Sequence, residues 1–146
     1  AVKQPLKVNQ LQLSAAFTPS FEAGFHVNME GPKAAVRDGS VFEYCRLTDT
    51  VIQAWSALQH GYFKGNFVGK EEFAALNHVL NDLAKKYQVT PTAIALAWVL
   101  RYPGKMQAVI GTTKPQHVLE AGKAATVTLT RKEWYQIYLA AGNDLP

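Results

Sequence analysis

The chain has 146 residues, of which 48% are hydrophobic, and this length suits one domain with one sizeable core. Its net charge of +4 is the balance of 15 lysines and arginines against 11 acidic residues. The basic residues are scattered along the sequence, so the clustered basic stripe of a nucleic-acid-binding protein is missing. The lone Cys45 excludes an internal disulfide framework, and no apolar stretch reaches signal-peptide or membrane-spanning length, so we expect a cytoplasmic protein with no membrane partner.

The first part of the chain predicts a strand, a short helix and a second strand. Residues 6–13, LKVNQLQL, alternate apolar and polar side chains, as a strand does. Ser40 followed by Glu43 has the spacing of a capping box, which favours a short helix that runs through Arg46. Residues 50–56, TVIQAWS, form a β-rich run bounded by turn formers, which is typical of a buried strand.

Helical signals dominate the middle of the chain. Apolar residues recur at three- and four-residue intervals between Phe73 and Tyr87 and predict an amphipathic helix. Thr90-Pro91 is the start signal of the next helix, which contains IALAWVL and stops at Pro103-Gly104.

The last part of the chain predicts one more strand and two helices. Residues 106–110, MQAVI, are short and β-rich, and Pro115 begins a helix shortly after them. Thr130 and Glu133 form a second capping box before a closing helix whose apolar face begins at Trp134.

This order of strands and helices predicts an α/β fold with right-handed crossovers and a parallel sheet. Three parallel strands are too few for such a sheet, and a closed (β/α)8 barrel takes about 250 residues. We therefore expect residues 1–146 to form a single, incomplete domain.

The segment VIGTTKPQHVLEAGKAA, residues 109–125, has the pattern of an anion site. A strand ends at Gly111, two threonines and Lys114 follow, and a helix begins at Pro115. Free backbone N–H groups and the positive end of a helix dipole would meet a cation there, so a phosphate is the expected guest. The alternative is that Thr113 or Lys114 only caps a surface helix.

Four segments resemble the C-terminal half of the aldo-keto reductases, most closely the YdhF-like group of bacterial oxidoreductases. They are VNQLQ at residues 8–12, AWSAL at 54–58, AVIGTTKPQHVLE at 108–120 and LTRKEWYQIYLAAGNDLP at 129–146. The resemblance implies a partial (β/α)8 TIM barrel made of roughly the last three βα units and a C-terminal helix. It also implies the NADP(H)-binding half of an enzyme that, when intact, transfers hydride between NADPH and a small carbonyl substrate.

The resemblance assigns the nicotinamide end to the first two strands. Gln10 matches the glutamine that holds the carboxamide, and Trp55 matches the aromatic residue on which the ring stacks. Ser56, Ala57 and Leu58 match the loop under the pyrophosphate. Without the resemblance, Gln10 would be interpreted as a barrel-interior amide, Trp55 as core and the loop as an ordinary strand exit.

The resemblance assigns the adenosine end to the last strand. The loop around the adenosine 2′-phosphate is matched by Gly111, Thr112, Thr113 and Lys114. Glu120 matches the acidic residue near the adenine amino group, and His117 stands where the family usually has arginine. Because histidine lacks arginine's permanent charge and bidentate fork, NADP is the expected cofactor and NAD remains possible.

No residue matches the family's catalytic aspartate, tyrosine, lysine and histidine, so we predict no catalytic residue, no metal site and no turnover by this chain alone. Whether the chain acts as an enzyme stays open on sequence grounds. The rival hypothesis is a non-catalytic half-barrel module that self-associates, or pairs with another half, through exposed sheet edges.

Overall fold

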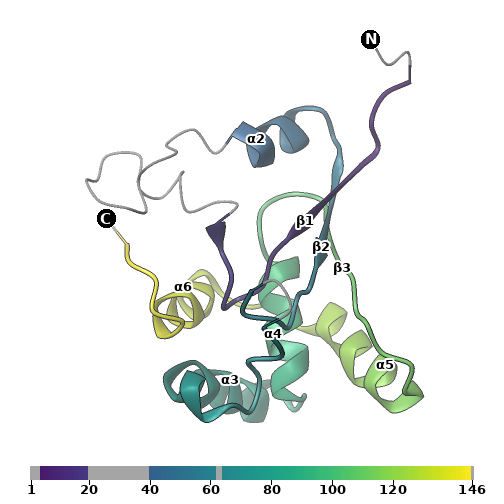
Figure 1. Ribbon diagram of the computed structural model, residues 1–146. Helices are drawn as coiled ribbons and strands as arrows, with labels where there is room; N and C mark the ends of the chain where they lie inside the picture. The colour runs from purple at the N-terminus through teal and green to yellow at the C-terminus, as the bar shows by residue number, and fades with distance from the viewer. Residues whose placement is uncertain (1–3, 20–39, 62–63, 146) are drawn as a thin grey trace.

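The computed structural model describes residues 4–19, 40–61 and 64–145, apart from the side chain of Ser40 (Figure 1). These residues contain a three-stranded sheet, in the order β1 (Val8–Gln12), β2 (Val51–Trp55) and β3 (Met106–Ala108). Both strand pairs are parallel, as predicted. The strands are shorter than the predicted ranges, although Val109 still donates its N–H to the carbonyl of Ala54 at 2.9 Å.

Five α-helices follow the predicted positions. They are α2 (Ser40–Leu47), α3 (Ala74–Tyr87), α4 (Pro91–Leu100), α5 (Pro115–Gly122) and α6 (Arg131–Ala140), with short 3-10 turns η2 (Glu71–Phe73) and η3 (Lys123–Thr126). The Thr90 hydroxyl accepts the N–H of Ala93 at 3.2 Å, which confirms the predicted start of α4. The predicted capping box of Thr130 and Glu133 is also present. The cap at Ser40 stays a prediction, since that side chain lies outside the described part.

The two faces of the sheet differ in polarity. Ile52 and Ala54 of β2 are buried in the core, on one face. The opposite face carries a row of three glutamines, because Gln10, Gln53 and Gln107 are register partners on adjacent strands. The side-chain amide of Gln53 donates to the side-chain oxygen of Gln107 at 2.9 Å. The edges of this sheet are β1 and β3, and self-association through them stays a prediction.

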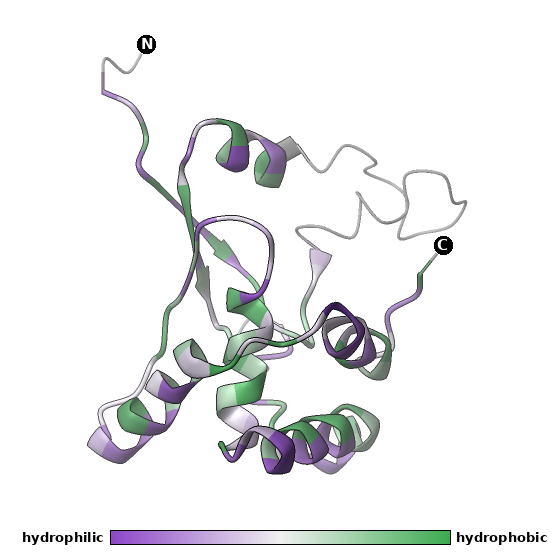
Figure 2. Ribbon diagram, turned by 180° about the vertical axis from the view of Figure 1, so that it is seen from behind, coloured by the Kyte–Doolittle hydropathy of each residue, from purple (hydrophilic) through white to green (hydrophobic). Residues whose placement is uncertain are grey.

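Helix α4 lies at the centre of the core. All seven residues from Ala93 to Val99 are buried, whereas α3 buries only one stripe. Figure 2 shows most of α4 as apolar, as expected of a helix that is covered on every side. It contacts β3, α3, α5 and η3, so one element holds the strand edge and the surrounding helices.

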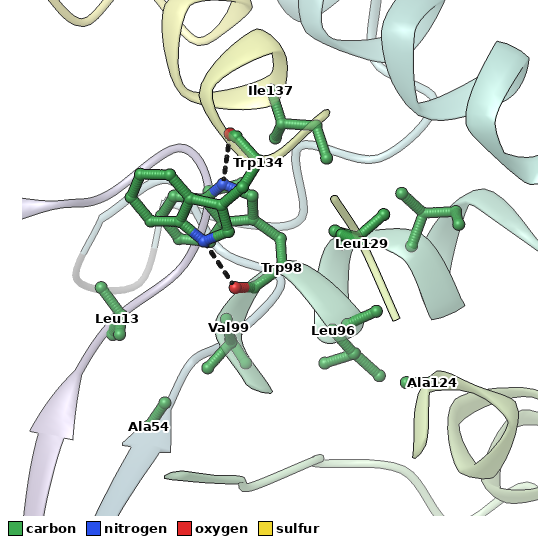
Figure 3. Close-up of a cluster of buried hydrophobic side chains, with 14 of the residues drawn as sticks. Leu13, Ala54, Leu96, Trp98, Val99, Ala124, Leu129, Trp134 and Ile137 are labelled. Carbon is green, nitrogen blue, oxygen red and sulfur yellow. Dashed lines mark hydrogen bonds between the residues drawn. The ribbon is translucent and has the colours of Figure 1, made fainter. Parts of the chain in front are cut away.

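Two tryptophans join α4 to α6. The indole N–H of Trp98 donates to the carbonyl of Trp134, and the indole N–H of Trp134 donates to the carbonyl of Trp98, both at 3.0 Å (Figure 3). Their rings stack with centroids 4.7 Å apart and planes 9° from parallel. Each buried N–H therefore has a partner, and the pair fixes the closing helix against the core.

A buried carboxylate joins α6 to α3. Glu133 accepts hydrogen bonds from the ammonium of Lys86, from the hydroxyl of Tyr87 at 2.8 Å, and from the N–H and hydroxyl of Thr130. Burial alone would raise the pKa of Glu133, but these hydrogen bonds outweigh it and lower the pKa from 4.5 to about 2. The carboxylate is therefore charged at neutral pH and ties α6 and its N-cap residue to the end of α3.

The described residues contain neither a membrane-spanning helix nor a cluster of metal-binding side chains. None of the described helices has both the length and the apolar composition needed to cross a bilayer. Within the same ranges, no three histidine, cysteine or acidic side chains are grouped closely enough to hold a metal ion.

Candidate functional site

The predicted site residues lie near one edge of the sheet. In a parallel sheet the carboxyl ends of all strands meet at the same edge, and ligands commonly bind there. β2 ends at Trp55, and Gly111 follows the end of β3 after two residues. The predicted loops 56–58 and 111–114 therefore leave neighbouring strands on the same side of the molecule.

A cleft of about 250 Å³ opens between these loops. Five of the predicted residues line it, namely Leu58, Gly111, Thr112, His117 and Glu120, together with Asn66, Thr92, Ile110 and Ala121. The structure thus brings together residues that are up to 62 positions apart in the sequence, since Leu58 and Glu120 face the same space. Thr113 and Lys114 are exposed and do not line the cleft.

Two helix N-termini point their first turns toward this cleft. Thr92 is the second residue of α4, and His117 is the third residue of α5. The positive ends of two helix dipoles favour an anion here, although the proline that begins each helix has no N–H to donate. Neither Asn66 nor Thr92 was predicted, because sequence spacing does not reveal that α4 begins beside α5.

The Gly111 loop is shaped for close approach to its backbone. A Cβ atom added at Gly111 would meet no atom within 4 Å, so the space above this residue is open. The Thr112 hydroxyl lies 3.3 Å from Nδ1 of His117 and accepts the N–H of Lys114 at 3.2 Å. Lys114 is the N-cap residue of α5, and its side chain makes no capping hydrogen bond.

The predicted nicotinamide residues lie on the glutamine-bearing face. Trp55 is half-buried at the end of β2, and its register partner on β1 is Gln12. Gln10 lies two residues before Gln12, so its side chain is on the same face. The structure therefore does not bury the indole deep in the core, as the alternative interpretation of Trp55 required. Gln10 is exposed on this face of the partial barrel.

The turn after β2 is held in an unusual backbone conformation. Ser56 has φ of 52°, which is the left-handed region, and its hydroxyl donates to the side-chain oxygen of Gln59 at 3.2 Å. Ala57 is only 2% exposed, so its side chain belongs to the core and only its backbone remains to serve a ligand. Leu58 alone of the three predicted loop residues reaches the cleft.

The sequence matches one protein-family profile and several curated proteins. The profile described as "Aldo/keto reductase family" matches residues 28–140. A 6-dehydroglucose reductase of Agrobacterium fabrum is 31% identical over 147 residues, which cover 99% of this chain and 42% of that protein. Oxidoreductase YdhF of Escherichia coli is 33% identical over 95 residues, which cover 64% of this chain and 30% of YdhF.

Solved structures agree in fold. The thermostable aldo-keto reductase Tm1743, in complex with the inhibitor epalrestat, superposes with a TM-score of 0.63 at 18% identity, covering 94% of this chain and 41% of that one. A Gox0644 mutant in complex with NADPH gives a TM-score of 0.57 at 16% identity, covering 92% and 38%. The chain spans about two fifths of the length of these relatives, and its parallel sheet and helices correspond to part of their barrel.

Proposed function

The chain belongs to the aldo/keto reductase family, as its motifs predicted, and from this premise we propose that its sheet edge binds a nicotinamide dinucleotide, NADP(H) in preference to NAD(H). The observation that carries the proposal is the position of Trp55 and the Gly111 loop at the carboxyl ends of neighbouring strands. Because neighbouring strands lie about 5 Å apart, we expect one dinucleotide to reach both places. The NADPH in the complex of the Gox0644 mutant supports this choice of ligand.

The phosphate end of the nucleotide fits the cleft. The open space above Gly111, the Thr112 hydroxyl and the positive dipole ends of α4 and α5 meet at this cleft and would favour a phosphate. Lys114 is exposed beside this cleft and would pair with a phosphate at its mouth. His117 supplies a ring nitrogen rather than a permanent charge, so the NADP preference rests mainly on Lys114 and the helix termini.

The nicotinamide end fits the glutamine-bearing face. When bound, the nicotinamide supplies the hydride that passes to or from a carbonyl carbon in this family. Trp55 would cover one side of the ring and leave the other side open, while the amide of Gln10 would orient the carboxamide. Ser56 and Ala57 would place backbone N–H groups under the pyrophosphate, on a turn already bent by the positive φ of Ser56.

We expect Gly111→Ala to raise the Kd for NADP roughly tenfold without loss of stability. The added methyl group has free space in the protein, so it costs little in folding, but it occupies the space through which the phosphate reaches the backbone. Isothermal titration calorimetry measures the Kd, and thermal unfolding measures the stability.

Gly122→Ala is the matched control, because a Cβ there also meets no atom within 4 Å and Gly122 does not line the cleft. It should bind NADP as the wild type does. Equal loss of affinity in both variants, or no nucleotide binding by the wild-type chain at millimolar concentration, would overturn the proposed site.

We further propose that these residues contribute nucleotide binding but no chemistry of their own. None of the six tyrosines occurs in a segment that matches the family's proton donor. The purified chain should therefore show no saturable NADPH consumption with a panel of aldehydes. Saturable turnover that disappears when one of its own tyrosines is changed to phenylalanine would disprove this.

A further inference from the structure

A second cavity lies at the opposite end of α4 from the cleft. It has a volume of about 290 Å³ and is lined by Arg101, Tyr102, Pro103, Arg131, Trp134 and Tyr135. Thr92, at the start of α4, lines the cleft, whereas Arg101 follows the last residue of α4. A helix of this length spans about 15 Å, so the two spaces are well separated.

The aromatic walls of this cavity are fixed in place. Trp134 is held by its reciprocal hydrogen bonds and stacking with Trp98 (Figure 3). The ring of Tyr135 stands 85° from that of Trp134 with centroids 5.1 Å apart. On the α4 side, Tyr102 packs edge-on against buried Phe42 at 4.9 Å. Rings that are already ordered lose little entropy when a flat ligand enters between them.

The charged groups of the cavity are all cationic. Arg101 donates its Nε–H to the carbonyl of Leu129 at 2.8 Å, which orients the guanidinium and leaves four of its donors unused by that contact. Arg131 lies over the ring of Tyr135, 5.8 Å from the centroid, and is the first residue of α6, where the helix dipole adds positive potential.

Among the described residues no acidic side chain lines the cavity, and two carboxylates on adjoining segments are already paired. Glu133 follows Arg131 closely in sequence, but its oxygens are bound by Lys86, Tyr87 and Thr130. Glu43, whose charge acts on Tyr102, forms an ion pair with Arg46 at 3.0 Å. Within the described part of the chain, these two carboxylates therefore do not neutralise the guanidinium groups of the cavity.

We propose that this cavity binds small aromatic carboxylates, with the ring against Trp134 and Tyr135 and the carboxylate between Arg101 and Arg131. Guanidinium groups bind carboxylates through paired, charge-assisted hydrogen bonds, and they also stack on aromatic rings. The volume suits a ligand with a single ring. This site does not depend on nucleotide binding at the other end of α4.

The test uses benzoate and its neutral analogue benzamide, titrated against the isotope-labelled chain and followed by amide cross-peaks in nuclear magnetic resonance spectra. Benzoate should shift signals of residues 101–103 and 131–135, and benzamide should bind at least roughly tenfold more weakly. Arg131→Gln should weaken benzoate binding roughly tenfold, since the cap at Thr130 and the core are untouched.

Lys132→Gln is the matched control, because it removes the same charge from an adjacent exposed position that does not line the cavity. It should leave benzoate affinity unchanged. Equal binding of benzamide, equal loss in Lys132→Gln, or shifts at residues 111–120 in place of this cavity would each overturn the proposal. Absence of any shift at millimolar benzoate would do the same.

Discussion

Replacing Trp98 with alanine is expected to lower the free energy of unfolding by about 3–5 kcal/mol. Trp98 is 1% exposed and belongs to the central helix α4. The substitution removes the stacked ring and leaves a cavity, and it also removes the N–H that satisfies the carbonyl of Trp134. Because small domains are stable by only about 5–15 kcal/mol, this loss is a large share of the total.

Urea denaturation followed by circular dichroism measures this loss. Trp98→Phe keeps an aromatic ring but has no indole N–H, so it should fall between the wild type and Trp98→Ala. Leu119→Ala is the surface control, since Leu119 is 67% exposed on α5, and its change should stay within about 0.5 kcal/mol. A Trp98→Ala midpoint equal to that of Leu119→Ala would show that the tryptophan pair does not hold the core.

Glu133→Gln is expected to lower the free energy of unfolding by about 3 kcal/mol at pH 7, and the loss should vanish in acid. The pKa of Glu133 is about 2 in the folded chain and 4.5 as its ordinary value. A carboxyl group with a depressed folded pKa stabilises the protein above its unfolded pKa and loses that contribution as pH falls through the folded value. The difference between wild type and variant should therefore shrink below about pH 4.5 and be gone near pH 2.

The same measurement on Glu43→Gln provides the control. Glu43 forms an ion pair with Arg46 at 3.0 Å, but its side chain is 63% exposed, so the pair should contribute less than about 1 kcal/mol. Urea midpoints between pH 2 and pH 7 give both curves. A Glu133→Gln effect that stays constant over this range would mean that packing, and not the charged network, holds α6 to α3.

Local features of the fold were predictable because they depend on neighbours in sequence. Thr90 and Thr130 cap their helices as predicted, since a hydroxyl at such a position satisfies an N–H only three residues away. The family motifs likewise predicted the residues at the carboxyl ends of the strands. Strand ends were predicted less well: residues 109 and 110 lie beyond β3, although Val109 keeps a backbone hydrogen bond to β2.

Features that depend on distant contacts were not predictable from spacing. Trp98 and Trp134 are separated by 36 positions, and nothing local to either one indicates that their indoles exchange hydrogen bonds. The same holds for Thr92 and Asn66, which reach the cleft only because α4 begins beside α5. Glu133 was predicted as half of a capping box, but its contact with Lys86 required the packing of α6 on α3.

The central claim is that a single dinucleotide spans Trp55 and the Gly111 loop. Titration of the isotope-labelled chain with NADP, followed by nuclear magnetic resonance, reports on both places at once through the indole N–H of Trp55 and the amides of residues 111–114. We predict that both sets of signals shift along one binding curve, and that NAD shifts residues 111–114 less. Shifts at only one of the two places, or two curves with different Kd values, would contradict the account.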